Sequence, residues 1–306
     1  MKWRKLGRVF VPDGRKPWAR THAYLPTPVI HGDVIRVYYS SLDERNVGRV
    51  GFVELDPADP TRVLAESDAP VLDVGELGCF DDNGVNPSSI LDWNGRTWMY
   101  YIGWQHAVRV PYLLFGGAAA SSDGGRSFER VQRVPVLDRI DAEPFSRSAP
   151  FVLAGGESDP LRMWYWSCRH WTAVEGAAPH YNNSISYAES RDGITWTGVR
   201  SRILDPAAGD YAIGRPWVVR DGSLYRMWFG ARSLTHRVPY RIDYAESDDG
   251  FAWTRKEPGI TVSESGWDSE MVCFAAVLDV NGRRLMFYNG NRHGATGFGV
   301  AELESD

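Results

Sequence analysis

The sequence predicts an all-β fold, a five-bladed β-propeller built from four-stranded blades, because short aromatic runs recur along the whole chain. These runs begin at Val37, Met99, Met163, Met227 and Met286, at successive separations of 62, 64, 64 and 59 residues. A fixed period of this length with several short strands per repeat is typical of propellers. Helical spacing of apolar residues is hardly visible, and Asp-Gly turns separate many of the apolar runs, as in β-hairpins.

Each repeat divides into four expected strands, and the fourth repeat shows this most clearly. Its expected strands cover 215–220, 224–230, 242–247 and 252–255, with Asp-Gly turns at 221–222 and 249–250. The third repeat copies the pattern with Ile185–Ser190 and a turn at 192–193, and the second with Gly117–Ser121 and a turn at 123–124. Asp-Gly between apolar runs is a strong hairpin signal, so each unit predicts a meander of antiparallel strands.

Three of these turns share a Ser-x-Asp-Gly pattern, in segments 121–128, 190–196 and 247–253. The first resembles the Asp-box hairpin of several propeller families. Because Asp side chains readily bond the backbone of their own turn, we interpret all three as structural hairpins and not as catalytic sites.

The two ends of the chain predict how the ring closes. The fifth repeat stops after Phe298–Leu303, which corresponds to the third strand of the other repeats, so its fourth strand is missing. Trp3–Phe10 precedes the first repeat and resembles a fourth strand. We therefore expect residues near 2–11 to complete the last blade, which removes exposed sheet edges. No interdomain linker is visible, and residues 1–306 are expected to form a single domain.

Composition excludes several functional classes. The chain carries 34 basic and 39 acidic residues, a net charge of −5, which disfavours nucleic acid as a partner. No stretch approaches the roughly 18 apolar residues of a membrane span, so no membrane partner is expected. Cys79, Cys168 and Cys273 lie too far apart in the sequence to indicate a disulfide framework. No apolar run follows the basic start, and a cytoplasmic location is expected.

Propeller connectivity places the loop entering strand one and the loop after strand two on the same face. These loops carry carboxylates, arginines, tryptophans and six of the seven histidines. Such groups around a central funnel suit a polar, hydroxyl-rich or anionic small molecule, so the expected partner is a small carbohydrate. The predicted substrate-binding residues are His22, Asn86, Arg147, His170, Asp210, Arg215, His236, Trp267 and Arg292. Arg147 and Arg215 are expected to bind a carboxylate or phosphate on the substrate.

The repeat pattern resembles the five-bladed propeller glycosidases, the superfamily of glycoside hydrolase families 32, 43, 62, 68, 117 and 130. The resemblance is clearest in segments 187–196 and 244–253. It implies a sugar-processing enzyme whose inner strands carry three carboxylates: a nucleophile or base, a residue that adjusts pKa, and a general acid.

The usual acid positions nevertheless depart from the family pattern. In families such as 43 the acid precedes a proline at the start of an inner strand, whereas here the residues before the corresponding prolines are Thr27, Asn86, Ala149 and Arg215. Glycosidic cleavage still requires two differently tuned carboxylates. We therefore predict catalytic roles for carboxylates in neighbouring loops: Glu270 as the general acid, Asp82 as nucleophile or base, and Glu143.

The predicted function is that of a glycoside hydrolase-like enzyme, a glycosidase or transglycosidase, acting on a small intracellular glycoside. A glycoside phosphorylase or another sugar-processing biosynthetic enzyme is the alternative, as is a repurposed or non-catalytic carbohydrate-binding propeller. No cofactor is expected. A metal enzyme is a further hypothesis because histidines and carboxylates share one face, but no His-x-x-x-His spacing supports it and no metal ligand is assigned.

Overall fold

The protein is almost entirely β-structure, as the sequence predicts. The computed structural model describes residues 1–156 and 159–305. Within these residues, strands β1–β20 carry the fold, and the helical element α1 (Asn291–Gly294) has only four residues. No helix in the described ranges is long and apolar enough to cross a membrane.

Strand pairing gives three four-stranded sheets, each formed by strands that are close in sequence or joined through the termini. The first comprises β2 (Thr21–His31), β3 (Val34–Leu42), β4 (Gly48–Leu55) and β5 (Val63–Glu66). The second comprises β14 (Asp210–Asp221), β15 (Leu224–Ser233), β16 (Tyr240–Ser247) and β17 (Thr254–Lys256). The third comprises β18 (Cys273–Val280), β19 (Arg283–Asn289), β20 (Phe298–Ser305) and β1 (Lys2–Phe10).

The remaining strands form one eight-stranded sheet. One half comprises β6 (Val85–Trp93), β7 (Arg96–His106), β8 (Tyr112–Ser121) and β9 (Glu129–Arg130). The other comprises β10 (Arg147–Leu153), β11 (Leu161–Val174), β12 (Ala177–Ser190) and β13 (Thr197–Leu204). A single parallel pair, Arg147 with Phe115, joins the halves. Strand pairing therefore divides the described strands into four sheets. The division into five four-stranded blades stays a prediction.

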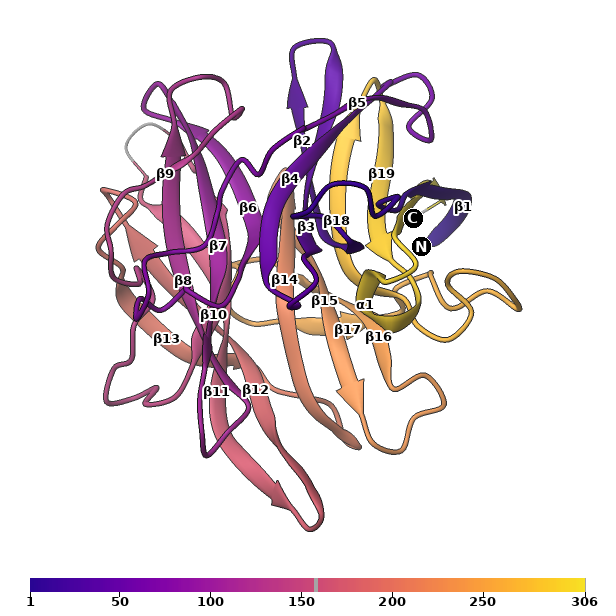
Figure 1. The fold of residues 1–306 in the computed structure, drawn as a ribbon. Coiled ribbons are helices and arrows are strands. Elements are labelled where there is room, and N and C mark those ends of the chain that lie inside the picture. The colour runs from indigo at the N-terminus through magenta and orange to yellow at the C-terminus, as the bar shows by residue number, and fades with distance from the viewer. Residues whose placement is uncertain (157–158, 306) are drawn as a thin grey trace.

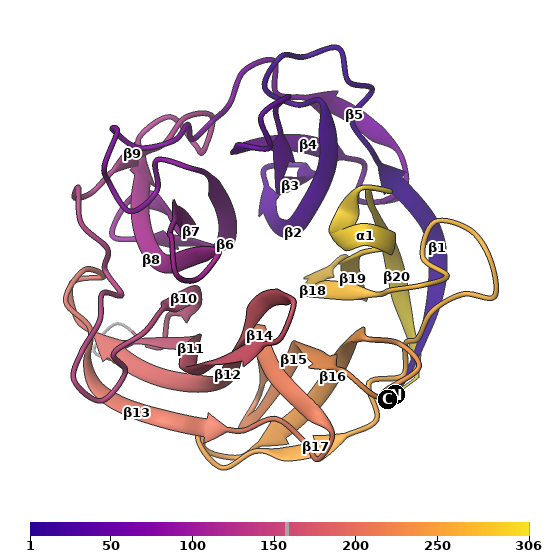
Figure 2. The same ribbon diagram turned by 60° about the horizontal axis from the view of Figure 1, so that its bottom comes forward.

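The sheets are arranged around a common centre. Figure 2 shows β2, β6, β10, β14 and β18 nearest the centre, with β5, β13, β17 and β1 at the periphery. One strand from each repeat thus borders the middle of the molecule. This arrangement matters for function because residues far apart in sequence face the same central space.

The recurring aromatic runs form the core. They lie on the second strands β3, β7, β11, β15 and β19, where Tyr38, Tyr39, Tyr100, Tyr101, Trp164, Tyr165, Trp228, Phe229, Phe287 and Tyr288 are all at most 1% exposed. Large rings bury much apolar area, and tyrosine hydroxyls find hydrogen-bond partners inside. The Tyr100 hydroxyl, for example, donates to the Gly193 carbonyl of the next repeat at 3.0 Å. The same runs that reveal the period therefore also hold neighbouring repeats together.

The Ser-x-Asp turns are structural, as predicted. In the first, the Ser121 hydroxyl donates to Asp123, and the backbone amides of Arg126 and Ser127 donate to the same carboxylate. These bonds, that from Ser121 foremost, hold the pKa of Asp123 well below its ordinary value. The turns at Asp192 and Asp249 repeat the arrangement.

The N-terminal strand pairs with the C-terminal strand, as the sequence predicts. Strand β1 lies antiparallel to β20, from Lys2 opposite Ser305 to Phe10 opposite Phe298. Trp3 anchors this strand: it is 6% exposed, and its ring meets Trp228 of β15 edge-on at 6.1 Å. The first residues of the chain thus contribute to a core cluster formed mainly by its second half.

Replacing Trp3 by Ala should lower the free energy of unfolding by about 3–5 kcal/mol, because it leaves a cavity in the core cluster that includes Trp228. Urea unfolding followed by circular dichroism measures the change. Lys2→Ala is the matched control: Lys2 makes an exposed ion pair with Glu304, and its loss should cost at most about 1 kcal/mol. Equal stabilities of the two variants would show that β1 is not anchored through Trp3.

Candidate functional site

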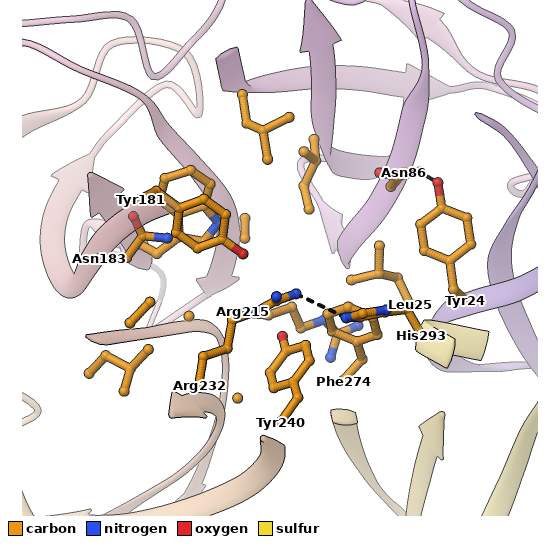
Figure 3. Close-up of a pocket in the computed structure, with 18 of the residues that line it drawn as sticks. Tyr24, Leu25, Asn86, Tyr181, Asn183, Arg215, Arg232, Tyr240, Phe274 and His293 are labelled. Atoms are coloured by element: carbon orange, nitrogen blue, oxygen red, sulfur yellow. Dashed lines mark hydrogen bonds between the residues drawn. The ribbon is translucent and has the colours of Figure 1, made fainter. Parts of the chain in front are cut away.

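A cavity of about 340 Å³ lies at the centre, where the inner strands converge. Its size falls within the range of small-molecule sites. Many of its walls are aromatic, contributed by Tyr24, Trp104, Tyr112, Trp166, Tyr181, Tyr240 and Phe274. Its polar members are Asn86, Asn183, Arg215, Arg232 and His293. Figure 3 shows the labelled side chains, which come from several different sheets, surrounding this space.

A repeated backbone irregularity aims residues at the cavity. Leu25, Ala149, Arg215 and Phe274 each have a φ between +50° and +58°, which non-glycine residues seldom adopt. Each lies at a register shift between the first and second strand of its group. All four line the cavity. The left-handed residue and the bulge thus turn one side chain per strand toward the centre.

The sequence places Thr27 at the position that corresponds to the family's acid in the first repeat. The bulge in β2 changes this assignment. In β2 the register shift spans Leu25 and Pro26, so Leu25 occupies the cavity position and Thr27 lies behind it. Thr27 is fully buried and donates to the Leu25 carbonyl at 2.9 Å. The cavity-facing residues at the four bulges are therefore all uncharged except Arg215.

No Asp or Glu side chain lines the central cavity among residues 1–156 and 159–305. Within the same ranges, no group of three or more His, Cys, Asp or Glu side chains is arranged to bind a metal ion. The charged lining groups are two arginines. The cavity is therefore aromatic and cationic, and its walls supply mainly hydrogen-bond donors and ring faces.

Arg215 is buried at the bulge of β14, with 3% of its surface exposed. Its guanidinium donates to the carbonyls of Ala275 and Pro26 at 2.6 and 2.9 Å, and to the Thr27 hydroxyl at 3.1 Å. Its Nε is buried and has no protein partner. Burial, which removes water from around the guanidinium, lowers the pKa of Arg215 to about 9.

Arg232 and His293 form a second polar pair in the cavity. Arg232 Nη2 lies 3.1 Å from His293 Nε2, and the guanidinium lies over the Tyr240 ring at 4.2 Å. Burial lowers the pKa of His293 to about 4, and the charges of Arg232 and His22 add to this effect. His293 is therefore neutral near pH 7, with Nε2 as acceptor and Nδ1 carrying the proton.

Asn86 is held rigidly on the opposite part of the lining. Its Nδ2 donates to the Tyr24 hydroxyl and to Ser40 Oγ, each at 2.8 Å, and its Oδ1 accepts a bond from Trp104 Nε1. Both Tyr24 and Trp104 line the cavity as well. This network fixes the positions of two aromatic rings of the cavity.

Curated relatives cover the whole chain. The uncharacterized proteins Rv1502 and MT1551 from two Mycobacterium tuberculosis strains are each 41% identical over 309 residues, spanning 100% of this chain and of each relative. The chain belongs to the Rv1502 family. No protein-family model matches the chain.

Solved structures show that this Rv1502-family member has the fold of family-43-like propeller glycosidases. A complex of BT0996 with RGII has a TM-score of 0.75 at 20% identity, covering 99% of this protein and 92% of that one. A thermostable family-43 glycoside hydrolase has a TM-score of 0.72 at 15% identity, covering 94% and 91%. An exo-1,5-α-L-arabinanase from a bovine ruminal metagenomic library has a TM-score of 0.64 at 13% identity, covering 93% and 94%. The resemblance stated from the sequence is thereby confirmed at the level of fold.

Of the three predicted catalytic residues, Glu270 is the one that lines either the central cavity or its neighbour. It borders a neighbouring cavity of about 490 Å³ together with Arg292, and that cavity shares His293 with the central one. The Glu270 side chain is exposed, while its backbone amide donates to Asn291 Oδ1 at 2.8 Å. Glu270 and Arg292 are thus brought together, as part of one rim.

Asp82 and Glu143 occupy different environments. Asp82 lines neither of these two cavities; its Oδ2 accepts a bond from the Gly78 amide, and its Oδ1 is buried without a protein partner. Glu143 is 4% exposed and accepts bonds from Arg147 Nε, the Tyr165 hydroxyl and Ser186 Oγ at 2.6–2.8 Å. Arg147 is thus paired with Glu143 and lines neither cavity.

Glu143 makes a type of contact that recurs in the fold. In each case a carboxylate in the loop before a first strand accepts a hydrogen bond from a tyrosine on the second strand. Asp81 accepts bonds from the Tyr101 hydroxyl and Arg130. Asp268 likewise accepts bonds from the Tyr288 hydroxyl and Lys5. The carboxylate-rich entry loops that the sequence shows are therefore used, at three places, to fasten the loop to the adjacent tyrosine and a cation.

The other predicted binding residues divide between the cavity and its surroundings. Asn86 and Arg215 line the central cavity, whereas Asp210 is paired through both carboxylate oxygens with Arg241. His22 packs edge-on against Tyr24 at 5.9 Å, and Trp267 packs on Tyr288 at 5.2 Å. His170 and His236 are exposed, and His236 Nδ1 accepts the Val238 amide.

Sequence reasoning missed several cavity residues, namely Tyr24, Tyr181, Asn183, Arg232, Tyr240, Phe274 and His293. Arg232 and His293 lie in loops after second strands that the sequence marks as facing the mouth, but the residues predicted from those loops are their neighbours His236 and Arg292. The choice between adjacent loop residues depends on backbone twist, and His293 reaches the cavity through a φ of +58°. No sequence pattern predicts a positive φ at a non-glycine residue such as His293.

Replacing Glu143 by Gln should lower the free energy of unfolding at pH 7 by about 3 kcal/mol, because it leaves Arg147 buried without a counter-charge. Burial alone would raise the pKa of Glu143, but the bonds from Ser186 and Tyr165 and the Arg147 charge outweigh it, and the folded-state pKa is lowered. The carboxylate's contribution is therefore present above the unfolded-state pKa of about 4.3 and is lost as the pH falls through the folded value.

Urea unfolding of wild type and Glu143→Gln at pH 7 and at progressively lower pH measures this difference, which should shrink below about pH 4. The exposed Glu270→Gln variant is the control and should change stability by less than about 0.5 kcal/mol. A difference between Glu143→Gln and wild type that stays constant down to acid pH would contradict the ion-pair interpretation.

Proposed function

We propose that this protein is a glycoside hydrolase-like enzyme that binds a small carbohydrate in the central cavity. We also propose that residues 1–306 form one domain of five four-stranded blades. The glycosidase fold and the aromatic cavity support the assignment together. Ring faces such as those of Trp104 and Trp166 suit the apolar faces of sugars, and the intervening polar groups suit hydroxyls.

The observation that carries the proposal is the position of this cavity. It lies where the bulges of four inner strands converge, so residues from far-separated repeats build it jointly. Its volume of about 340 Å³ favours a ligand of one or two sugar rings over a polymer held along its length.

Glu270 is the proposed general acid. It is the only carboxylate bordering the central cavity or its neighbour among the described residues. The acid in glycosidic cleavage protonates the leaving oxygen while positive charge develops at the anomeric carbon. A leaving group extending from the central cavity past His293 would bring its glycosidic oxygen toward this rim. Asp82 and Glu143 remain predicted catalytic residues, and the cavity lining favours Glu270 over both.

Glu270→Gln should lower kcat for a cleaved aryl glycoside or aryl furanoside by about 10²–10⁴-fold, because the amide cannot donate the proton. The protein should otherwise fold and bind normally, since Glu270 is exposed. Release of the chromogenic aglycone measures the rate. Glu264→Gln is the matched control, because it makes the same change on an exposed residue that lines neither cavity, and it should retain the activity.

Substrates with good leaving groups test whether Glu270 acts as the general acid. An aglycone of low pKa needs little protonation, so Glu270→Gln should lose less activity on a dinitrophenyl glycoside than on a phenyl glycoside. Wild-type rates in Glu270→Gln on every cleaved glycoside would overturn its assignment. A loss confined to Asp82→Asn would transfer the role to that residue.

A carbohydrate-binding protein without hydrolytic activity is the second candidate. The specific observation in its favour is that no carboxylate lines the central cavity within the described residues. It differs from the first candidate in one measurable respect: a sugar would bind and quench the fluorescence of Trp104 and Trp166 while no glycoside in the panel is cleaved.

A further inference from the structure

We propose that Arg215 and Arg232 form a subsite for an anionic group, a carboxylate or a phosphate, beside a sugar whose hydroxyl is bound by Asn183. The inference rests on the proposed carbohydrate cavity and specifies the chemistry of its ligand. It follows from charge, from two unpartnered buried atoms and from the arrangement around Arg232.

The first step is the charge balance. Two other buried arginines, Arg36 and Arg147, are paired with the carboxylates of Glu54 and Glu143. Arg215 instead donates to two carbonyls and a hydroxyl, and no described carboxylate lines the cavity. A buried cation without a counter-charge is unfavourable unless something supplies one. An anionic ligand would supply it.

The second step is the unpartnered donor. Arg215 lines the cavity and is only 3% exposed. Its Nε is buried and makes no hydrogen bond within the protein. Leaving a buried donor unpaired costs about 1–3 kcal/mol, and more for a charged group. Such an atom calls for a specific explanation. An oxygen of a bound anion beside Nε satisfies this donor.

The third step is an unpartnered acceptor in the same cavity. Asn183 is 3% exposed, and its Oδ1 is buried without a partner. An acceptor in this position requires a donor such as a hydroxyl group. An anion without a hydroxyl group satisfies only the arginine, whereas a hydroxylated molecule carrying an anionic group satisfies both atoms.

The fourth step concerns Arg232. Neutral His293 accepts its Nη2 hydrogen, and the Tyr240 and Tyr181 rings lie at 4.2 and 5.6 Å from its guanidinium carbon. These contacts orient the guanidinium without neutralising it. Because arginine forks match carboxylate and phosphate oxygens, an oriented and uncompensated Arg232 favours an anion over a neutral hydroxyl.

The anion has two sources that share this chemistry. It is either part of the sugar itself, as in a uronic acid or sugar phosphate, or a separate inorganic phosphate bound beside a neutral sugar. Equilibrium binding to the whole protein tests the subsite without requiring turnover, so a failure to cleave glycosides does not bear on it.

The probes are inorganic phosphate, glucuronate and galacturonate, with glucose and galactose as uncharged counterparts, titrated while Trp fluorescence or protein NMR shifts are recorded. At least one uronate or phosphate should bind at or below about 10 mM, at least about tenfold more tightly than the uncharged sugars. Phosphate that competes with the uronate indicates an anion carried by the sugar. Phosphate that binds together with an uncharged sugar indicates a separate anion.

Arg232→Gln should weaken anion binding at least about tenfold and leave the uncharged sugars unchanged, since a bond to a charged group contributes about 1.5–3 kcal/mol. Arg8→Gln makes the same charge change on an exposed residue of β1 and should bind anions as wild type does. If Arg232→Gln does not fold, the wild-type preference for anions over uncharged sugars decides. Equal affinity for both, no anion binding, or anion binding unaffected in folded Arg232→Gln would overturn the subsite.

Discussion

The geometry of the site depends on one backbone constraint, the bulge that recurs near the start of the inner strands. A left-handed residue at Leu25, Ala149, Arg215 and Phe274 turns a side chain out of the regular pleat and into the centre. Such conformations are strained for residues with a Cβ atom. They persist because the flanking strands are paired on both sides of each bulge. The cavity is therefore a product of the repeated architecture, and the side chains at the four bulges form part of its wall.

The cavity lining differs from the three-carboxylate pattern that the family resemblance implies, because no described carboxylate lines it. Carboxylates in the entry loops bond to tyrosines and cations, as Glu143 does with Tyr165 and Arg147. The cavity receives arginine, histidine and aromatic rings instead. The positive charge of the cavity favours an anionic ligand. The exposed carboxylate at the rim, that of Glu270, would donate a proton from outside the cavity.

Much of the fold is predictable from local pattern. The aromatic period identified the second strands, and the Ser-x-Asp turns identified three hairpins, because burial of rings and turn hydrogen bonds are encoded over a few residues. The pairing of Trp3–Phe10 with the last strand was also predictable, since a missing strand at one end matched an extra strand at the other.

The site was less predictable because it depends on backbone conformation between distant segments. Asn86 and Arg215 were found through their place before a proline, and Glu270 and Arg292 through their loops. Arg232 and His293 were not, because only the fold brings β15 and α1 into contact around one cavity. The sequence places Glu143 in a loop on the mouth face, and only the structure shows that its side chain is buried beside Arg147. Sequence spacing locates a loop on a face, whereas packing decides which side chains point inward.

The most direct test of the account is a crystal structure of the protein with the tightest-binding anion of the phosphate and uronate panel. The account predicts that the anionic group lies within hydrogen-bonding distance of Arg215 Nε and the Arg232 guanidinium. When the ligand is a uronate, a sugar hydroxyl should also donate to Asn183 Oδ1. A ligand bound outside the central cavity, or a uronate whose carboxylate points away from both arginines, would contradict it.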